Sequence, residues 1–207
     1  MTVLVLVRHG ETLWNSERRI QGQRNSELSP RGLAQAEAVA GHLRSDPATM
    51  LLSSDLGRTM QTAAPLARVT GLSVEPQPRL RERAFGIFEG MTVDEIRQRH
   101  PREYARWRSR DPEYALPGGE SLLQVRERVS RVLEGVAARG AARVIAVTHG
   151  GVLDAVYRIT CGIAEDVPRD WVLRNASINA IEIVGSHWHL RRWGDIDHLG
   201  ESDDDGV

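Results

Sequence analysis

The chain has 207 residues, which suffices for one large domain with a sizeable core. Its 27 basic and 28 acidic residues give a net charge of −1, which argues against a nucleic-acid partner. A single cysteine, Cys161, excludes an internal disulfide and fits a reducing compartment.

The start of the chain lacks the features of a secretory signal peptide. It has no basic segment, and only the short apolar run 3–7 precedes Arg8. No apolar segment approaches the length needed to cross a bilayer. We therefore expect a cytoplasmic protein without a membrane partner. Cys161 falls in the apolar stretch 152–163, which predicts a buried, unreactive thiol.

The apolar, β-branched run 3–7 predicts a buried strand, which stops at Arg8, His9 and Gly10. In open α/β sheets, reactive groups gather at the carboxyl ends of such strands. The polar stretch 8–27 lacks periodicity and predicts a long loop over the strand ends. Residues 144–151 repeat the arrangement, with His149 followed by glycines. The two histidines predict one site in which two imidazoles face each other.

Strand-like and helix-like segments alternate between these two points. Ser29 and Pro30 are typical of a helix start, and the apolar stripe of that helix begins at Leu33. The later predicted elements are a strand at 49–53, a helix to about residue 69, a strand at 72–75, a helix at 120–138, a strand at 143–148, a helix at 151–161 and strands at 177–184 and 187–193. Such alternation predicts an α/β fold with a mostly parallel sheet covered on both faces.

The segment 76–119 interrupts the alternation. It is rich in aromatic and arginine residues, and we expect a helical, lid-like excursion over the active edge of the sheet. No linker divides the chain, so residues 1–207 are predicted to form one domain. The acidic tail 201–207 predicts disorder.

The residues around His9 favour a chemical role for it. A neighbouring cation such as Arg8 disfavours protonation of the imidazole and leaves a neutral nitrogen free to attack. Arg58 lies at a predicted helix start, five residues beyond the second strand. If the first two strands are neighbours, Arg8 and Arg58 converge above the sheet and, with the helix N-terminus, suit a trianion. His149 would then donate a third charge-assisted hydrogen bond from the opposite side.

Glu82 is a candidate general acid. Successive side chains of an extended segment point to opposite sides, which predicts that Glu82 projects away from Arg81 and Arg83. A bound phosphate would favour the protonated carboxyl through its negative charge. Glu11 and Glu89 are the nearest competitors, and spacing does not exclude them. Together these groups predict phosphoryl transfer in which arginines and an imidazole replace a metal ion.

Motifs along nearly the whole chain closely resemble those of the histidine phosphatase superfamily, in its cofactor-dependent phosphoglycerate mutase-like branch. The matching positions, in order, are LVRHGET at 6–12, WN at 14–15, QG at 21–22, LS at 28–29 with Gly32, SSDLGRT at 53–59, TA at 62–63, LRE at 80–82, Gly86, EG at 89–90, GGES at 118–121 and VTHGG at 147–151. The resemblance implies a three-layer α/β/α sandwich and no metal requirement.

The resemblance also implies roles for individual residues. His9 is the expected phosphorylated nucleophile and Glu82 the expected proton donor. Arg8, Arg58 and His149 are the expected phosphate-binding residues. The remaining two matching positions, which contact the phosphate or the substrate in similar proteins, are Asn15 and Gln21.

Departures from the pattern bear on whether the enzyme is a phosphatase or a mutase. Similar mutases have a Tyr and a Lys where this chain has Phe85 and Val93, and the excursion lacks an adjacent Arg-Arg pair. These differences weaken the binding of a distal phosphate, and the ending 194–199 resembles that of broad phosphatases. We expect a phosphatase that acts on a small phosphorylated metabolite without a cofactor. The alternative is a phosphoglycerate mutase that uses 2,3-bisphosphoglycerate.

The residues alone do not exclude two other classes of protein. A binding module would capture a phosphorylated ligand without turnover, although every expected catalytic residue is present. A metal hydrolase could use His187 and His189, which share a strand face, but no carboxylate cluster accompanies them. The oligomeric state is open too, with a homodimer as one alternative.

Overall fold

The structure is a computed structural model that describes residues 1–185 and 187–200, and one six-stranded sheet forms its centre. The strands are β1 Thr2–Arg8, β2 Met50–Ser53, β3 Val74–Pro76, β4 Arg143–Thr148, β5 Ile178–Val184 and β6 His187–Asp195. Their order across the sheet is β3-β2-β4-β1-β5-β6. The first four strands are parallel to one another, and β5 and β6 run antiparallel to their neighbours. The prediction of an α/β fold with a mostly parallel sheet is confirmed.

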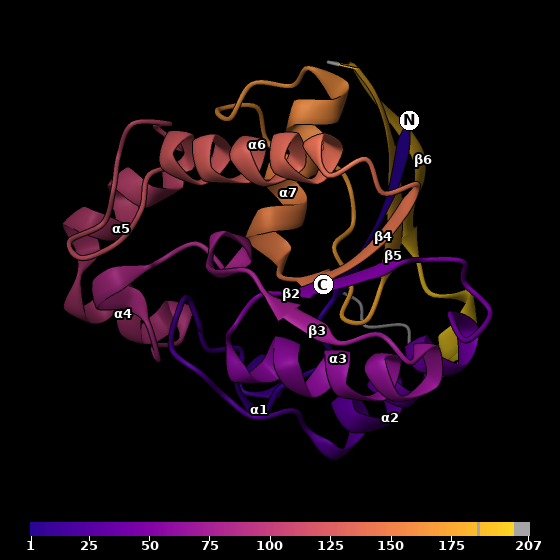
Figure 1. The fold of residues 1–207 in the computed structure, drawn as a ribbon. Helices are drawn as coiled ribbons and strands as arrows, with labels where there is room; N and C mark the ends of the chain where they lie inside the picture. Colours follow the sequence, from indigo (N-terminus) through magenta and orange to yellow (C-terminus); the bar gives the residue numbers. More distant parts are fainter. Residues whose placement is uncertain (186, 201–207) are drawn as a thin grey trace.

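Helices cover both faces of the sheet and give the molecule three layers (Figure 1). Helices α2 Pro30–His42 and α3 Gly57–Thr70 pack on one face, and α6 Leu122–Ala138 and α7 Gly150–Cys161 pack on the other. Strand β1 is apolar on both sides because it lies between these two layers. Its side chains alternate between two cores: Leu4 and Leu6 pack on the α6–α7 side, and Val5 and Val7 on the α2–α3 side.

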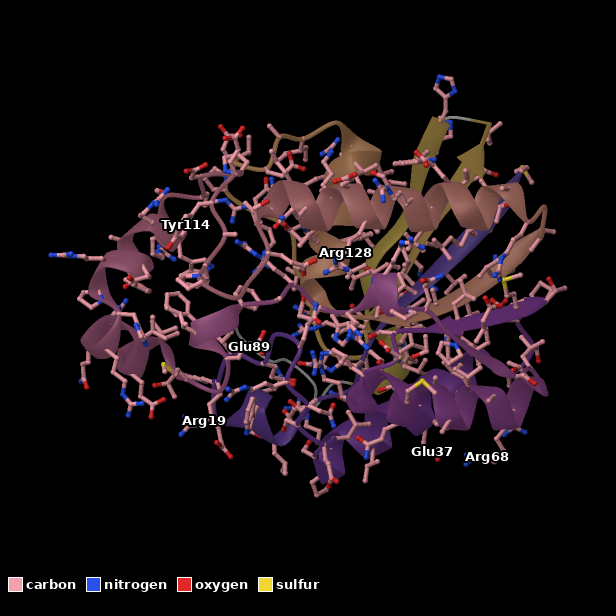
Figure 2. The ribbon with its side chains drawn as sticks, turned by 60° about the vertical axis from the view of Figure 1, so that its left-hand side comes forward. Arg19, Glu37, Arg68, Glu89, Tyr114 and Arg128 are labelled. Carbon is pink, nitrogen blue, oxygen red and sulfur yellow. The ribbon has the colours of Figure 1, made fainter. Side chains whose placement is uncertain are left out.

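Helix α2 begins where the sequence predicts. The Ser29 hydroxyl accepts a hydrogen bond from the Gly32 amide at 3.0 Å, and the helix starts with proline. Leu33 is 50% exposed, so its predicted place in the core is wrong, because the buried stripe lies on the adjoining face of the helix. At the surface, Glu37 of α2 forms an ion pair with Arg68 of α3 (Figure 2).

The excursion between β3 and α6 has a small apolar core of its own. It contains the 3-10 turns η1 Pro78–Leu80 and η2 Gly86–Phe88 and the helices α4 Val93–Arg99 and α5 Pro101–Arg108. Phe88, Ile96 and Leu116 are buried together, and Trp107 packs against them. Figure 1 shows α4 and α5 projecting from one side of the three-layer body.

The segment that follows β1 is more ordered than the predicted loop. It includes the short helix α1 Leu13–Ser16, which begins at a capping box formed by Thr12 and Asn15. Arg19 donates a hydrogen bond to the Gly90 carbonyl at 2.9 Å, and in Figure 2 Arg19 and Glu89 lie where this segment meets the excursion. The strand ends are therefore surrounded by segments that hold one another in place.

Several other predictions can be compared with the structure. Cys161 is exposed, which corrects the expected burial, because it is the last residue of α7. The tail 201–207 lies outside the described residues. Among the helices that are described, none combines the length and the apolar character that crossing a bilayer requires.

Candidate active site

The two histidines lie side by side at the carboxyl ends of adjacent strands. Strand β1 pairs with β4 in a register that sets Arg8 opposite Thr148, and the His9 amide donates to the Thr148 carbonyl at 3.0 Å. The ring centroids of His9 and His149 are 5.2 Å apart, with the ring planes at 60°. His9 is 3% exposed and His149 is completely buried. The pairing of two imidazoles is thus a direct result of parallel strand pairing.

The hydrogen bonds of His9 determine its tautomer. Its Nδ1 lies 2.7 Å from the Gly10 carbonyl oxygen, which can only accept, so Nδ1 carries the proton and Nε2 keeps a lone pair. Gly10 is required there because a Cβ atom would lie 2.4 Å from the Gly32 carbonyl oxygen. Burial lowers the pKa of His9 well below its ordinary value, and the charges of Arg58 and Arg8 lower it further, against the opposing effect of the Gly10 bond. The ring is therefore neutral at neutral pH.

His149 has one nitrogen engaged by protein. Its Nε2 lies 2.9 Å from the hydroxyl of Ser54, which directly follows β2. Its Nδ1 is buried and has no hydrogen-bond partner among residues 1–185 and 187–200. Burial lowers the pKa of His149 well below its ordinary value, and the nearby charge of Arg58 adds to this effect. Because buried polar atoms in folded proteins normally have a hydrogen-bond partner, this nitrogen indicates that a ligand binds beside it.

Arg58 is fully buried beside the histidines. Its guanidinium donates to the carbonyls of Arg24 and Gly22, both at 2.8 Å, while Nε has no partner in the part of the chain that the structure describes. Burial lowers the pKa of Arg58 to about 10, so the group is still charged at neutral pH. The carbonyls orient the guanidinium without neutralising it.

The route by which Arg8 and Arg58 meet differs from the predicted one. Strand β4 lies between β1 and β2, so the two strands are not neighbours. Both charges nevertheless act on His9 and His149. The contribution of the α3 N-terminus stays a prediction, and one amide of its first turn, that of Arg58, already donates to the Asn25 side chain at 3.1 Å. Arg8 itself donates to the Leu173 carbonyl.

Glu82 lies at the N-terminus of α7. Its carboxylate accepts hydrogen bonds from the Gly151 amide, at 3.0 and 3.1 Å, and from the Arg83 amide at 2.8 Å. The positive end of the helix dipole suits a carboxylate at this position. Arg81 lies away from the cavity that Glu82 lines, as predicted, and it pairs with Asp55. The same expectation is wrong for Arg83, which lines the same cavity as Glu82 and whose guanidinium donates to the Glu120 carbonyl at 2.8 Å.

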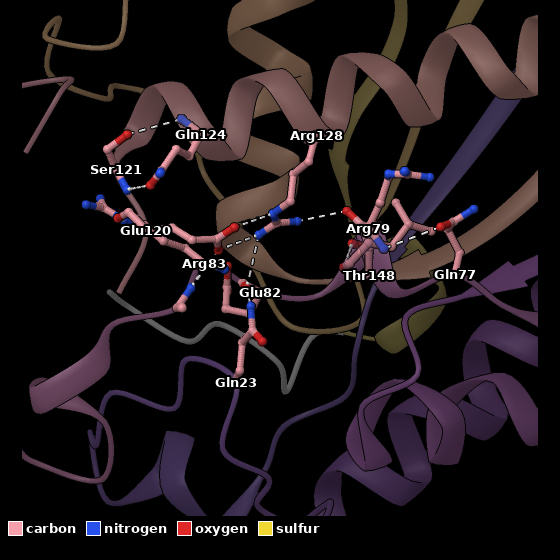
Figure 3. A network of polar contacts seen from close by, with 12 residues as sticks. Gln23, Gln77, Arg79, Glu82, Arg83, Glu120, Ser121, Gln124, Arg128 and Thr148 are labelled. Carbon is pink, nitrogen blue, oxygen red and sulfur yellow. Dashed lines mark hydrogen bonds and ion pairs between the residues drawn. The ribbon is translucent and has the colours of Figure 1, made fainter. Parts of the chain in front are cut away.

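The backbone around Glu82 is clamped by α6. Arg128 donates to the carbonyls of Glu82, at 3.1 Å, and Arg79, at 2.8 Å, and pairs with the Glu120 carboxylate. The side-chain amide of Gln23 donates to the Glu82 carbonyl from the opposite side, at 3.2 Å (Figure 3). These partners give Glu82 a defined position over the strand ends.

The three glutamates that are candidates for the general acid have different hydrogen-bond partners in the structure. The Glu89 carboxylate accepts from the amides of Gln23, Arg24 and Phe85, so it ties the segment 8–27 to the excursion. Glu11 accepts from the Ser29 hydroxyl at 2.6 Å, next to the N-terminus of α2. Glu82 is the glutamate that lies beside the N-terminal glycines of α7, directly after His149.

A cavity of about 1440 Å³ opens over this region. Arg8, Glu82 and Gly150 line it, as does Asn15, whose side-chain oxygen accepts from the Thr12 amide. Gln21 is buried and is not part of the cavity lining. Of the predicted residues, Gln21 is therefore the one that the structure does not bring to the cavity or to the imidazole pair.

Sequence reasoning assigned no role to several residues at the site. Asn175 lines the cavity and donates to the His9 carbonyl at 3.0 Å. Ser54 could have been found from its position directly after a strand, like His9 and His149. Asn175 and Arg128 carry no comparable local signal, because each reaches the site from a segment distant in sequence.

The alternative metal site has little support in the geometry. His187 and His189 lie on the exposed edge strand β6. Within the described ranges, no three His, Cys, Asp or Glu side chains are grouped so that they could hold a metal ion.

Comparisons with known proteins agree with this geometry. The sequence profile of the histidine phosphatase superfamily (branch 1) matches residues 4–196. A probable phosphoglycerate mutase, GpmB of Yersinia pestis, is 36% identical over 209 residues, which cover 96% of this chain and 95% of that protein.

Solved structures are similar over nearly the full length. YhfR of Bacillus stearothermophilus has a TM-score of 0.90 and 30% identity, covering 97% of this chain and all of that one. A mycobacterial glucosyl-3-phosphoglycerate phosphatase complexed with VO3 has a TM-score of 0.84 and 34% identity, and the match covers 95% of this chain and 100% of that one. A putative alpha-ribazole-5'-P phosphatase of Escherichia coli has a TM-score of 0.86 and 26% identity, and the match covers 94% of this chain and 96% of that one. This chain belongs to the histidine phosphatase superfamily and is an enzyme of its phosphatase or mutase-like kind.

Proposed function

We propose that this enzyme is a metal-independent phosphatase of small phosphomonoesters. The Nε2 lone pair of His9 attacks phosphorus, and the bond from phosphorus to the ester oxygen breaks. The leaving oxygen takes a proton from Glu82. Water then attacks the phosphohistidine, which releases inorganic phosphate and returns His9 to its starting state, while Glu82 regains its proton from that water.

The observation that carries this proposal is the buried, neutral His9 whose Nδ1 is bonded to the Gly10 carbonyl. That bond directs the lone pair of Nε2 away from the backbone. Burial lowers the pKa of His9 most, and the charges that lower it further, those of Arg58 and Arg8, are also suited to bind the phosphoryl oxygens. One arrangement thus serves both the nucleophile and the transferred group.

Two buried atoms support phosphate binding at this place. Arg58 Nε and His149 Nδ1 lack partners among the described residues, and both belong to side chains beside His9. Phosphoryl oxygens would satisfy them. Because phosphoryl transfer depends on positioning and on stabilisation of negative charge, fixed guanidiniums can supply what a metal ion supplies elsewhere.

The assignment as a phosphatase, with mutase activity as the alternative, rests on two positions in the excursion between β3 and α6. Phe85 and Val93 occupy the places where similar mutases carry a Tyr and a Lys. Two of the similar solved structures carry phosphatase in their names, whereas GpmB is a probable phosphoglycerate mutase. A mutase would need 2,3-bisphosphoglycerate as cofactor, and a phosphatase would need none.

The test combines turnover with trapping of the intermediate. We expect the purified enzyme to release phosphate from p-nitrophenyl phosphate and to isomerise phosphoglycerate poorly, with or without the bisphosphate. Rapid quenching with radiolabelled substrate should label His9, and His9→Ala should lose both label and turnover. Bisphosphate-dependent isomerisation that exceeds phosphate release would make the enzyme a mutase. Binding without any turnover of a broad panel of phosphomonoesters would make it a binding module.

A further inference from the structure

We propose that Arg110 and Arg158 form a second anion subsite in the cavity, which binds a carboxylate of the substrate on the leaving-group side of the phosphate. This inference rests on the proposed function and defines its substrate class: phosphomonoesters that carry a carboxylate at a distance from the phosphate. Neither arginine belongs to the phosphate site around His9.

The cavity carries more positive charge than the phosphate site explains. Nine arginines line it against six carboxylates. Arg83 follows Glu82 in sequence, and its charge interacts with Glu82, Arg110 and Asp154. The groups therefore form a continuous path along the wall, from the proposed proton donor to the second subsite. A leaving group that accepts a proton from Glu82 would extend along this path.

Arg158 is held rigidly, with one nitrogen left unused. It is 1% exposed, its Nε pairs with Asp154 at 2.9 Å, and another nitrogen donates to the Ala164 carbonyl. Its guanidinium lies 4.7 Å from the centre of the Trp171 ring. The third nitrogen is buried and has no hydrogen-bond partner among the described residues. Because burial of an unsatisfied charged donor is unfavourable, this nitrogen indicates a missing acceptor.

Arg110 supplies the second unsatisfied donor. One of its terminal nitrogens donates to the Glu165 carbonyl at 2.8 Å, and its Nε is buried without a partner in the described part of the chain. Burial and the charge of Arg158 lower the pKa of Arg110, so the two guanidiniums repel each other when nothing lies between them.

The balance of charge favours a carboxylate over a second phosphate. Asp154 compensates one of the two guanidiniums, the Glu165 carboxylate is paired with Arg126, and the opposite charges of Asp166 and Arg169 both act on Arg110. One positive charge and two unused N–H donors remain, which matches a monoanion with two acceptor oxygens.

The test uses phosphorylated hydroxy acids of increasing chain length, each compared with its own methyl ester. For at least one length we expect kcat/KM of the acid to exceed that of the ester by about 10-fold or more, as for a hydrogen-bonded charge. The ratio should fall towards one in Arg110→Gln. Arg158→Lys, which keeps the buried charge, should also lower it. Arg18→Gln removes a guanidinium from another part of the cavity lining and should leave the ratio unchanged.

The outcomes separate the two proposals. If the wild-type enzyme fails to hydrolyse p-nitrophenyl phosphate, the proposed function is wrong. If it hydrolyses that ester but shows no preference for acids at any length, only the subsite is refuted. An equal loss of preference in Arg18→Gln would refute it too, since general cavity charge would then explain the effect. Preference for a bisphosphorylated substrate over every acid would overturn the carboxylate assignment.

Discussion

Replacing Gly151 with alanine should displace the proposed proton donor without removing it. A Cβ atom at this position would lie 2.2 Å from Glu82 Oε1 and 3.3 Å from its carboxyl carbon. Real Cβ contacts are essentially never shorter than 3.0 Å, so the carboxylate must retreat by about 1 Å. A misplacement of that size at a reacting group costs roughly 10²-fold in rate. The atom that moves is the end of a flexible side chain, so the fold should tolerate the change.

The expected effect on stability is small because two contributions oppose each other. Alanine is preferred over glycine inside a helix by about 1 kcal/mol. Weakening the hydrogen bonds between the Glu82 carboxylate and the Gly151 amide costs about 1.5–3 kcal/mol. The net change in the free energy of unfolding should therefore stay within about 2 kcal/mol, which chemical denaturation can measure.

The assay compares two leaving groups in Gly151→Ala and in a control, Gly135→Ala, which adds a methyl group in open space on α6. Alkyl phosphates need protonation of the leaving oxygen, so their kcat should fall about 10²-fold in Gly151→Ala. Hydrolysis of p-nitrophenyl phosphate should change little, because p-nitrophenolate departs without a proton. Equal losses for both esters, or no loss for either, would refute the assignment of Glu82.

Two further changes test the charges of the site. Glu82→Gln should slow alkyl phosphates about 10²-fold or more while p-nitrophenyl phosphate is largely spared, and a loss shared by both esters would move the acid role to another group. Burial holds the pKa of His9 and of His149 well below 6.5, so below that pH the unfolded chain binds protons that the folded chain does not. The contribution of the two neutral histidines to the free energy of unfolding should be complete above about pH 6.5. Below that pH the free energy of unfolding should decrease, by up to about 1.4 kcal/mol per pH unit for each histidine. Urea unfolding of His149→Gln at pH 7.5 and 5.5 should show a smaller decrease than the wild-type protein, and an unchanged decrease would contradict this linkage.

The sequence was most informative where local patterns determine structure. Continuous apolar runs of strand length indicate strands that are buried on both faces, and β4 has the predicted bounds, 143–148. Because parallel strands end at the same edge of a sheet, the positions of His9 and His149 could be inferred before their contact was known. The cap at Ser29 followed from a local hydrogen bond that short-range sequence encodes.

The sequence was less informative about partners that are distant along the chain. Spacing did not choose among Glu11, Glu82 and Glu89, because the choice depends on which amides each carboxylate reaches in the folded chain. The tertiary structure ties Glu89 to the segment 8–27 and brings Glu82 to Gly151. Arg58 is another example, since carbonyls more than thirty residues away orient it.

The sequence alone predicted the α/β fold, the order of the elements and the position of two histidines at strand ends. These features could be predicted because hydrophobic periodicity and capping are properties of short segments. The tertiary structure alone decided that β4 separates β1 from β2, that the proton of His9 is on Nδ1, and that Arg83 shares a cavity with Glu82. These features depend on strand order, burial and hydrogen bonds between segments far apart in the chain, and such contacts exist only once the chain has folded.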